Sequence, residues 1–150
     1  MASVDFDAGR FPLVVLTYPS RPTAETITRL YADWDELLAR GPHGVIIDLR
    51  SADPLHFTAP VRRMAAEQVE RRRAAFEKSL IVEARVVSGV VVRGIVTAFD
   101  WIIGASFSRP LANFDDWGDA ERFVARYLPV REASAGRPGT AGPASRRDRR

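Results

Sequence analysis

Hydrophobic residues recur along this chain with two different periods, which alternate from one end to the other. Short runs rich in β-branched and aromatic residues predict strands at residues 4–7, 11–18, 45–49, 80–87 and 111–114. After residues 23, 58, 89 and 116 the apolar residues instead recur every three or four positions, which is the period of a helix with one buried face. The predicted order is two strands, then helix and strand in alternation, ending on a helix.

Turn and capping residues place the ends of several of these elements. Gly9 can adopt the positive φ of a tight turn, so the first two strands should pair as an antiparallel hairpin. Thr23 and Thr58 each precede a helical pattern and are placed to accept backbone amide hydrogen bonds as N-caps. Asp115 or Asp116 should do the same for the last helix.

Strands that are separated by helices need crossover connections, which produce a mostly parallel sheet with both faces covered. The run at residues 45–49 is almost continuously apolar, as expected of a central strand. Tyr31 and Trp34 lie on the apolar face of the first helix and are predicted to be core residues. We therefore expect an α/β fold in one domain, residues 1–130, with an N-terminal β-hairpin, a four- to five-stranded sheet and four helices.

Positive charge is concentrated in the last part of the chain. Residues 131–150 contain six arginines against Glu132 and Asp148, a net +4, and because the whole chain carries +3, residues 1–130 carry −1. The same segment has no large apolar residue, so we predict that it is a disordered Arg-rich tail. Nucleic-acid binding is therefore expected of the tail at most, and not of the domain.

Membrane insertion and export are not expected. The apolar helical pattern at residues 90–103 is shorter than the roughly 20 residues that span a bilayer, and it contains Arg93 and Asp100. The chain does not begin with the charged and apolar regions of a signal peptide, and it has no cysteine. We expect a cytoplasmic protein, and a homodimer stays open.

Most catalytic motifs are missing from the sequence. It contains neither a phosphate-binding loop nor a dinucleotide-binding glycine motif. Its two histidines, His43 and His56, do not have metal-ligand spacing and are predicted to lie in loops. We therefore expect a protein without cofactor, metal or catalytic machinery, which works by binding.

The element order resembles that of STAS and SpoIIAA-like domains. The features that carry the likeness are the N-terminal hairpin, Thr23 at the start of the first helix, the strand that leads into Arg50, and the C-terminal stretch from Ala84 through Trp101 to Ala120. The likeness covers residues 4–128 and is to a group of uncharacterised bacterial STAS-like proteins. STAS domains are binding modules, which implies a protein partner.

The resemblance also directs attention to the loop after the central strand. In anti-sigma factor antagonists of this superfamily, that loop carries an aspartate and a serine that a partner kinase phosphorylates. Here the loop, residues 50–58, lacks the Asp-Ser-Ser-Gly signature and offers only Ser51 and Thr58 as hydroxyl groups. Phosphorylation at either residue is thus a hypothesis, and Thr58 is also explained as a helix cap.

Polar residues follow several of the predicted strands. In a parallel sheet, ligands bind beyond the carboxyl ends of the strands, where residues 48–53, 88–93 and 113–116 should meet. The amides of Ser88 and Gly89, with Arg93 one turn later, could hold an anion; the alternative is that Ser88 only caps the helix. The predicted ligand- or partner-binding residues are Asp48, Ser51, Asp53, Thr58, Ser88, Gly89 and Arg93.

These observations favour a regulatory module that binds another protein, in a bacterial signalling or partner-switching pathway. The first alternative is a carrier of a small apolar or anionic ligand, a role associated with SpoIIAA-like relatives. The second is an enzyme that uses Asp48, Asp53 or His56 as acid or base, which nothing in their spacing favours.

Overall fold

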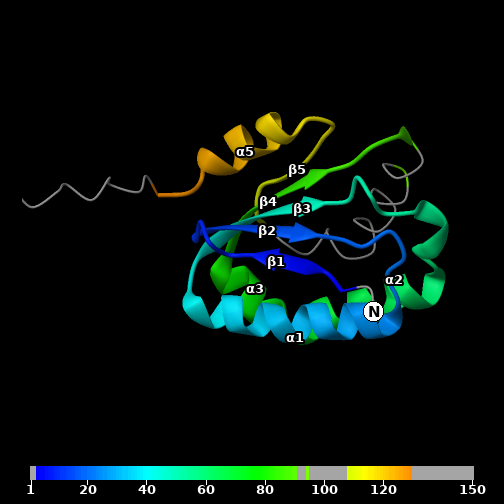
Figure 1. Cartoon of the computed structure of the whole chain (residues 1–150). Coiled ribbons are helices and arrows are strands. Elements are labelled where there is room, and N and C mark those ends of the chain that lie inside the picture. The colour runs from blue at the N-terminus through cyan, green and yellow to red at the C-terminus, as the bar shows by residue number, and fades with distance from the viewer. Residues whose placement is uncertain (1–2, 91–93, 95–107, 130–150) are drawn as a thin grey trace, which may run out of the picture.

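A computed structural model describes residues 3–90, 94 and 108–129 of the chain (Figure 1). The strands are β1 (Asp5–Asp7), β2 (Leu13–Thr17), β3 (His43–Asp48), β4 (Leu80–Val86) and β5 (Leu111–Phe114). The helices are α1 (Ala24–Arg40), the 3₁₀ turn η1 (Pro54–His56), α2 (Ala59–Arg71), α3 (Arg73–Ser79) and α5 (Trp117–Ala125).

The strands form one five-stranded sheet in the order β1-β2-β3-β4-β5. β1 and β2 pair as the predicted antiparallel hairpin, and every later pair is parallel. The predicted α/β fold, with its N-terminal hairpin and mostly parallel sheet, is therefore confirmed. Because β2 to β5 run in the same direction, their carboxyl ends lie along one edge of the molecule, on the right in Figure 1.

Helices cover both faces of the sheet. On one face lie α1, α2 and α3, and on the other lies α5 (Figure 1). The period of two along each strand divides its side chains between the two cores. Val45 and Ile47 of β3 face the larger core, between the sheet and α1, whereas Ile46 faces α5.

Capping explains where α1 begins and ends. The hydroxyl of Thr23 accepts the Thr26 amide at 3.2 Å, as predicted for an N-cap. Gly41, with φ of 114°, ends the helix in a conformation that favours glycine. Tyr31 and Trp34 of α1 are each 4% exposed, so the prediction that both are core residues is confirmed.

The segment after Thr58 differs from the single helix that was expected. It forms α2 and α3, which meet at Arg72 (φ −106°, ψ 9°). The Arg72 guanidinium pairs with Asp35 of α1 at 2.6 Å, so the break serves a tertiary contact.

Two sequence predictions fall outside the part of the chain that the structure describes. Of the helix expected at residues 90–103, only Val90 and Gly94 are described, and both are helical. The predicted disordered tail at residues 131–150 also lies outside. Among the described helices, none combines the length and hydropathy needed to cross a membrane.

Candidate functional site

The loops that follow β3 and β4 meet at the carboxyl edge of the sheet, as the topology predicted. Leu49 donates its amide to the Val86 carbonyl at 2.9 Å and so extends the pairing of these strands. Beyond it, the Ser88 hydroxyl donates to the Arg50 carbonyl at 3.2 Å. These bonds hold the two loops together at their base.

Asp48, the last residue of β3, is bound to a cation. Its carboxylate accepts the Arg50 amide and side-chain Nε, each at 3.0 Å, and the guanidinium Nη2 at 2.7 Å. Hydrogen bonds from Arg50 hold the pKa of Asp48 below its usual value, although partial burial opposes this. The same guanidinium lies 5.4 Å from the ring centre of Trp117 at the start of α5. Asp48 therefore anchors Arg50 over this ring and stays ionised at neutral pH.

Asp53 organises the loop after β3. Its carboxylate caps η1 by accepting the Leu55 amide at 3.0 Å, and it accepts His56 Nδ1 at 2.9 Å. The Leu55 amide bond is the main reason that the pKa of Asp53 lies below its usual value. The Asp53 amide donates to the Ser20 carbonyl at 2.8 Å, which fixes the loop to the connection between β2 and α1.

The two hydroxyl residues of this loop are both exposed. Thr58 occupies the N-cap position of α2, but its side chain makes no capping hydrogen bond, so the predicted capping bond is wrong. Its backbone is extended, with ψ of 161°, which is the usual conformation of an N-cap residue. Ser51 lies in the turn directly after β3.

The predicted anion site is only partly described. Gly89 has φ of 82°, and no atom lies within 4 Å of the position where a Cβ would stand. The Ser88 hydroxyl is engaged with the Arg50 carbonyl. Arg93, the cation of this hypothesis, lies outside the described residues, so the anion site stays a prediction.

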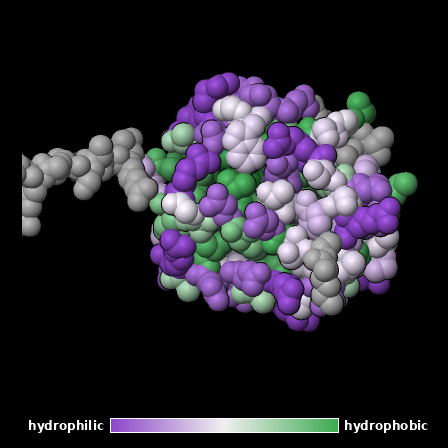
Figure 2. Space-filling view, viewed as in Figure 1, coloured by the Kyte–Doolittle hydropathy of each residue, from purple (hydrophilic) through white to green (hydrophobic). Residues whose placement is uncertain are grey.

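Two large apolar side chains project from the same loops. Leu55 of η1 is 84% exposed and Val90, directly after Gly89, is 87% exposed. Figure 2 shows isolated hydrophobic side chains that protrude at this edge of the molecule. Polar residues hold the backbone of these loops in place, while apolar ones point into solvent.

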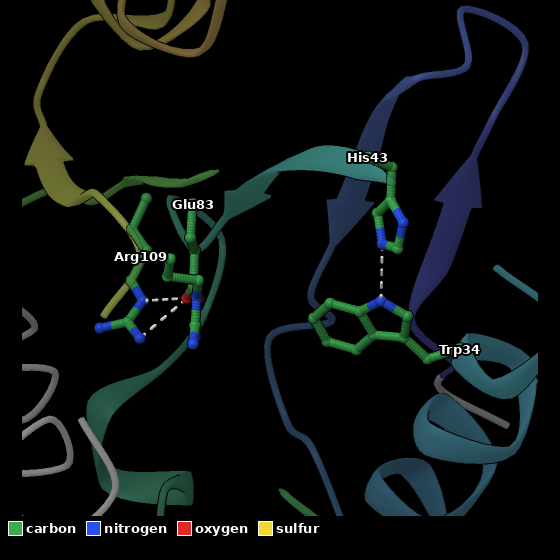
Figure 3. Close-up of polar contacts among 5 residues, drawn as sticks. Trp34, His43, Glu83 and Arg109 are labelled. Carbon is green, nitrogen blue, oxygen red and sulfur yellow. Dashed lines mark hydrogen bonds and ion pairs between the residues drawn. The ribbon is translucent and has the colours of Figure 1, made fainter. Parts of the chain in front are cut away.

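A buried charged cluster under the sheet was missed by sequence reasoning (Figure 3). Glu83 of β4 is 3% exposed and accepts Arg85 Nε at 2.8 Å and Arg109 Nε at 3.1 Å. Burial alone would raise the pKa of Glu83, but the two guanidinium groups outweigh it and hold this pKa below its usual value. The signal was available: two charges two residues apart in a buried strand must share one face.

His43 corrects another expectation, because it lies in β3 rather than in a loop and is fully buried. Its Nε2 accepts the indole N–H of Trp34 at 3.3 Å (Figure 3). Nδ1 therefore carries the proton and donates it to the Gly41 carbonyl at 3.0 Å. Burial lowers the pKa of His43, so the ring is a neutral core group.

No metal site is evident in the described part of the chain, where three or more His, Asp or Glu side chains nowhere gather to hold an ion. The carboxylates at the strand ends are instead occupied by Arg50, by His56 and by backbone amides. The chain matches no protein-family model and no curated protein sequence. The resemblance to STAS domains thus stays a prediction that rests on element order and residue pattern.

Proposed function

We propose that this chain is a non-enzymatic binding module that recognises a protein partner in a cytoplasmic signalling pathway of the partner-switching type. Its contact region is the strand-end surface, which we define as Ser51, Leu55, Thr58, Ser88 and Val90. The observation that carries the proposal is the exposure of Leu55 and Val90, 84% and 87%, on loops that the hydrogen bonds of Asp53 and Ser88 hold in place.

Apolar side chains on anchored loops favour recognition of another protein. Burying a leucine or valine side chain contributes about 1.5–3 kcal/mol, and a contact surface that is already ordered loses little entropy on binding. Asp53 fixes the loop that carries Leu55, and Ser88 ties the loop that carries Val90 to its neighbour. A partner would therefore meet a preformed surface.

Proton-transfer chemistry has little support at the same place. A general acid or base needs a pKa near the working pH. The pKa values of Asp48 and Asp53 are instead shifted downward, because Arg50 and the Leu55 amide stabilise the ionised carboxylates. This favours a binding role over an acid–base role for both residues.

The exposed hydroxyls of Ser51 and Thr58 support control of this surface by phosphorylation. A phosphate adds about −1.5 to −2 charges at neutral pH. Placed close in sequence to Leu55, it would oppose the burial of that side chain in an apolar partner pocket. Phosphorylation would then release the partner.

The test compares partner capture by the wild-type chain with capture by Leu55→Asp and Val90→Asp. Tyr127→Asp is the matched control, since Tyr127 is also an exposed apolar residue, 46% exposed, beyond the end of α5. The wild-type chain and the control should capture equal amounts of the same partner protein. Each strand-end variant should capture at least tenfold less of it. Equal retention by all four proteins, with unchanged circular dichroism, would refute the proposal.

A further inference from the structure

Part of the sheet surface on the side of α5 has no helix over it in the described residues. α5 packs mainly against β3, β4 and β5, and of the described β1 and β2 side chains Leu13 alone packs against the core that α5 covers. Leu13, Val15 and Thr17 of β2 alternate toward this side and are only half-buried, while Val14 and Leu16 are buried beneath the sheet. Figure 2 shows a hydrophobic area between α5 and α1, with hydrophilic residues around it.

The neighbouring strand adds negative charge to this area. Asp5 pairs directly with Thr17, and Asp7 with Val15, so both aspartates share the face of their partners. Both are exposed, and neither forms an ion pair with another described residue. We call these five residues the hairpin face: Asp5, Asp7, Leu13, Val15 and Thr17.

The described chain ends beside this face. Leu128 packs over Gly44, where an added Cβ would stand 3.1 Å from its Cδ2 atom. Gly44 is the register partner of Leu13. The segment that follows therefore starts at the near end of the hairpin face, whose far end lies four residues along β2.

Chain length and charge both favour residues 131–150 as the segment that covers the hairpin face. Residues 131–150 carry a net +4, whereas the hairpin face carries two carboxylates. From Pro129 an extended chain can span at most about 28 Å to Arg137, and the face is only about 14 Å long along β2. A second copy of the chain fits poorly, because a two-fold contact through this face would bring like charges together.

We propose that residues 131–150 dock on the hairpin face of their own chain. Arg131 and Arg137 would place guanidinium groups at Asp5 and Asp7, with their aliphatic stems along Leu13 and Val15. The contact is electrostatic and solvent-exposed, so it is reversible and weakened by salt. It withholds the arginines from other anions, and it does not depend on the strand-end surface.

The chain contains no cysteine, so a single introduced cysteine can carry a spin label in the whole 150-residue chain. A nitroxide spin label on Ser134→Cys should at least halve the intensity of the amide signals of β2, relative to the reduced label, at low ionic strength. Raising the ionic strength from about 0.01 M to about 1 M, which shortens the Debye length from about 30 Å to about 3 Å, should restore them.

Charge-neutralising variants locate the contact. The double variant Asp5→Asn, Asp7→Asn should restore the β2 signals at low salt. The control Asp33→Asn, Glu36→Gln, which removes two exposed charges from α1, should not. Undiminished β2 signals, or broadening that persists in the double variant, would overturn the proposal. A mixture of isotope-labelled chains without the spin label and spin-labelled chains without isotopes should show no broadening. Broadening of the β2 signals in that mixture would also overturn the proposal, since the contact would then join two copies.

Discussion

Replacing Glu83 by glutamine isolates the charge at the centre of the buried cluster. The substitution preserves the shape of the side chain but removes the carboxylate that accepts hydrogen bonds from both Arg85 and Arg109. Loss of one member of a buried ionic cluster generally costs about 3–5 kcal/mol. One amide oxygen can still accept a hydrogen bond, worth about 1 kcal/mol, so we expect a loss of about 3 kcal/mol in the free energy of unfolding.

Equilibrium unfolding in urea measures this loss. For an m-value of about 1.5 kcal/mol per M, the midpoint of the Glu83→Gln variant should fall by about 2 M with m unchanged. The control is Glu70→Gln, which breaks the exposed pair between Glu70 and Arg73 and should change the free energy of unfolding by less than about 0.5 kcal/mol. Equal small losses in both variants would show that burial does not strengthen the Glu83 cluster, and would refute this reasoning.

Three further predictions concern local contacts, all measured by urea unfolding. Thr23→Ala should lower the free energy of unfolding by about 1 kcal/mol, because it removes a capping hydrogen bond. Thr58→Ala should lower it by at most a few tenths of a kcal/mol, because the Thr58 side chain makes no such bond. Equal losses in the two variants would contradict the geometry. Gly44→Ala should lower the free energy of unfolding by about 1–3 kcal/mol, since the added Cβ would stand 2.7 Å from Cγ1 of Val82 in β4. Gly94→Ala should not lower it, because a Cβ there meets no atom within 4 Å. Burial lowers the pKa of His43, so as the pH falls the unfolded chain binds a proton at this residue before the folded chain does. The free energy of unfolding should therefore decrease below about pH 6.5, by at most about 1.4 kcal/mol per pH unit. His43→Gln should remove this pH dependence. An unchanged pH dependence in the variant would show that another group causes it.

Elements formed by contacts between near neighbours were predictable from the sequence. The hairpin, the cap at Thr23 and the strand at Leu111–Phe114 all depend on residues within a few positions of one another. The break at Arg72 was not predictable, because the helical period continues through it. It depends on Asp35, which lies 37 positions away in the chain.

The candidate site divides in the same way. Sequence reasoning placed Asp48, Asp53 and Ser88 at one edge, because the carboxyl ends of parallel strands must meet there. It did not show that Asp48 and Asp53 are already bonded within the protein, nor that Leu55 and Val90 are the exposed groups. Side-chain partners across a loop depend on its backbone path, which residue type alone does not determine.

The sequence by itself determined the order of the elements and the class of the fold, because hydrophobic period and capping act over one turn or one strand. Only the tertiary structure decided which polar groups are buried and with what partners. Glu83 and Arg109 are 26 positions apart and meet because β4 and β5 lie side by side, and His43 reaches Trp34 because α1 crosses beneath β3. Such pairs are set by the packing of elements against one another, so they become visible only when the whole domain is assembled.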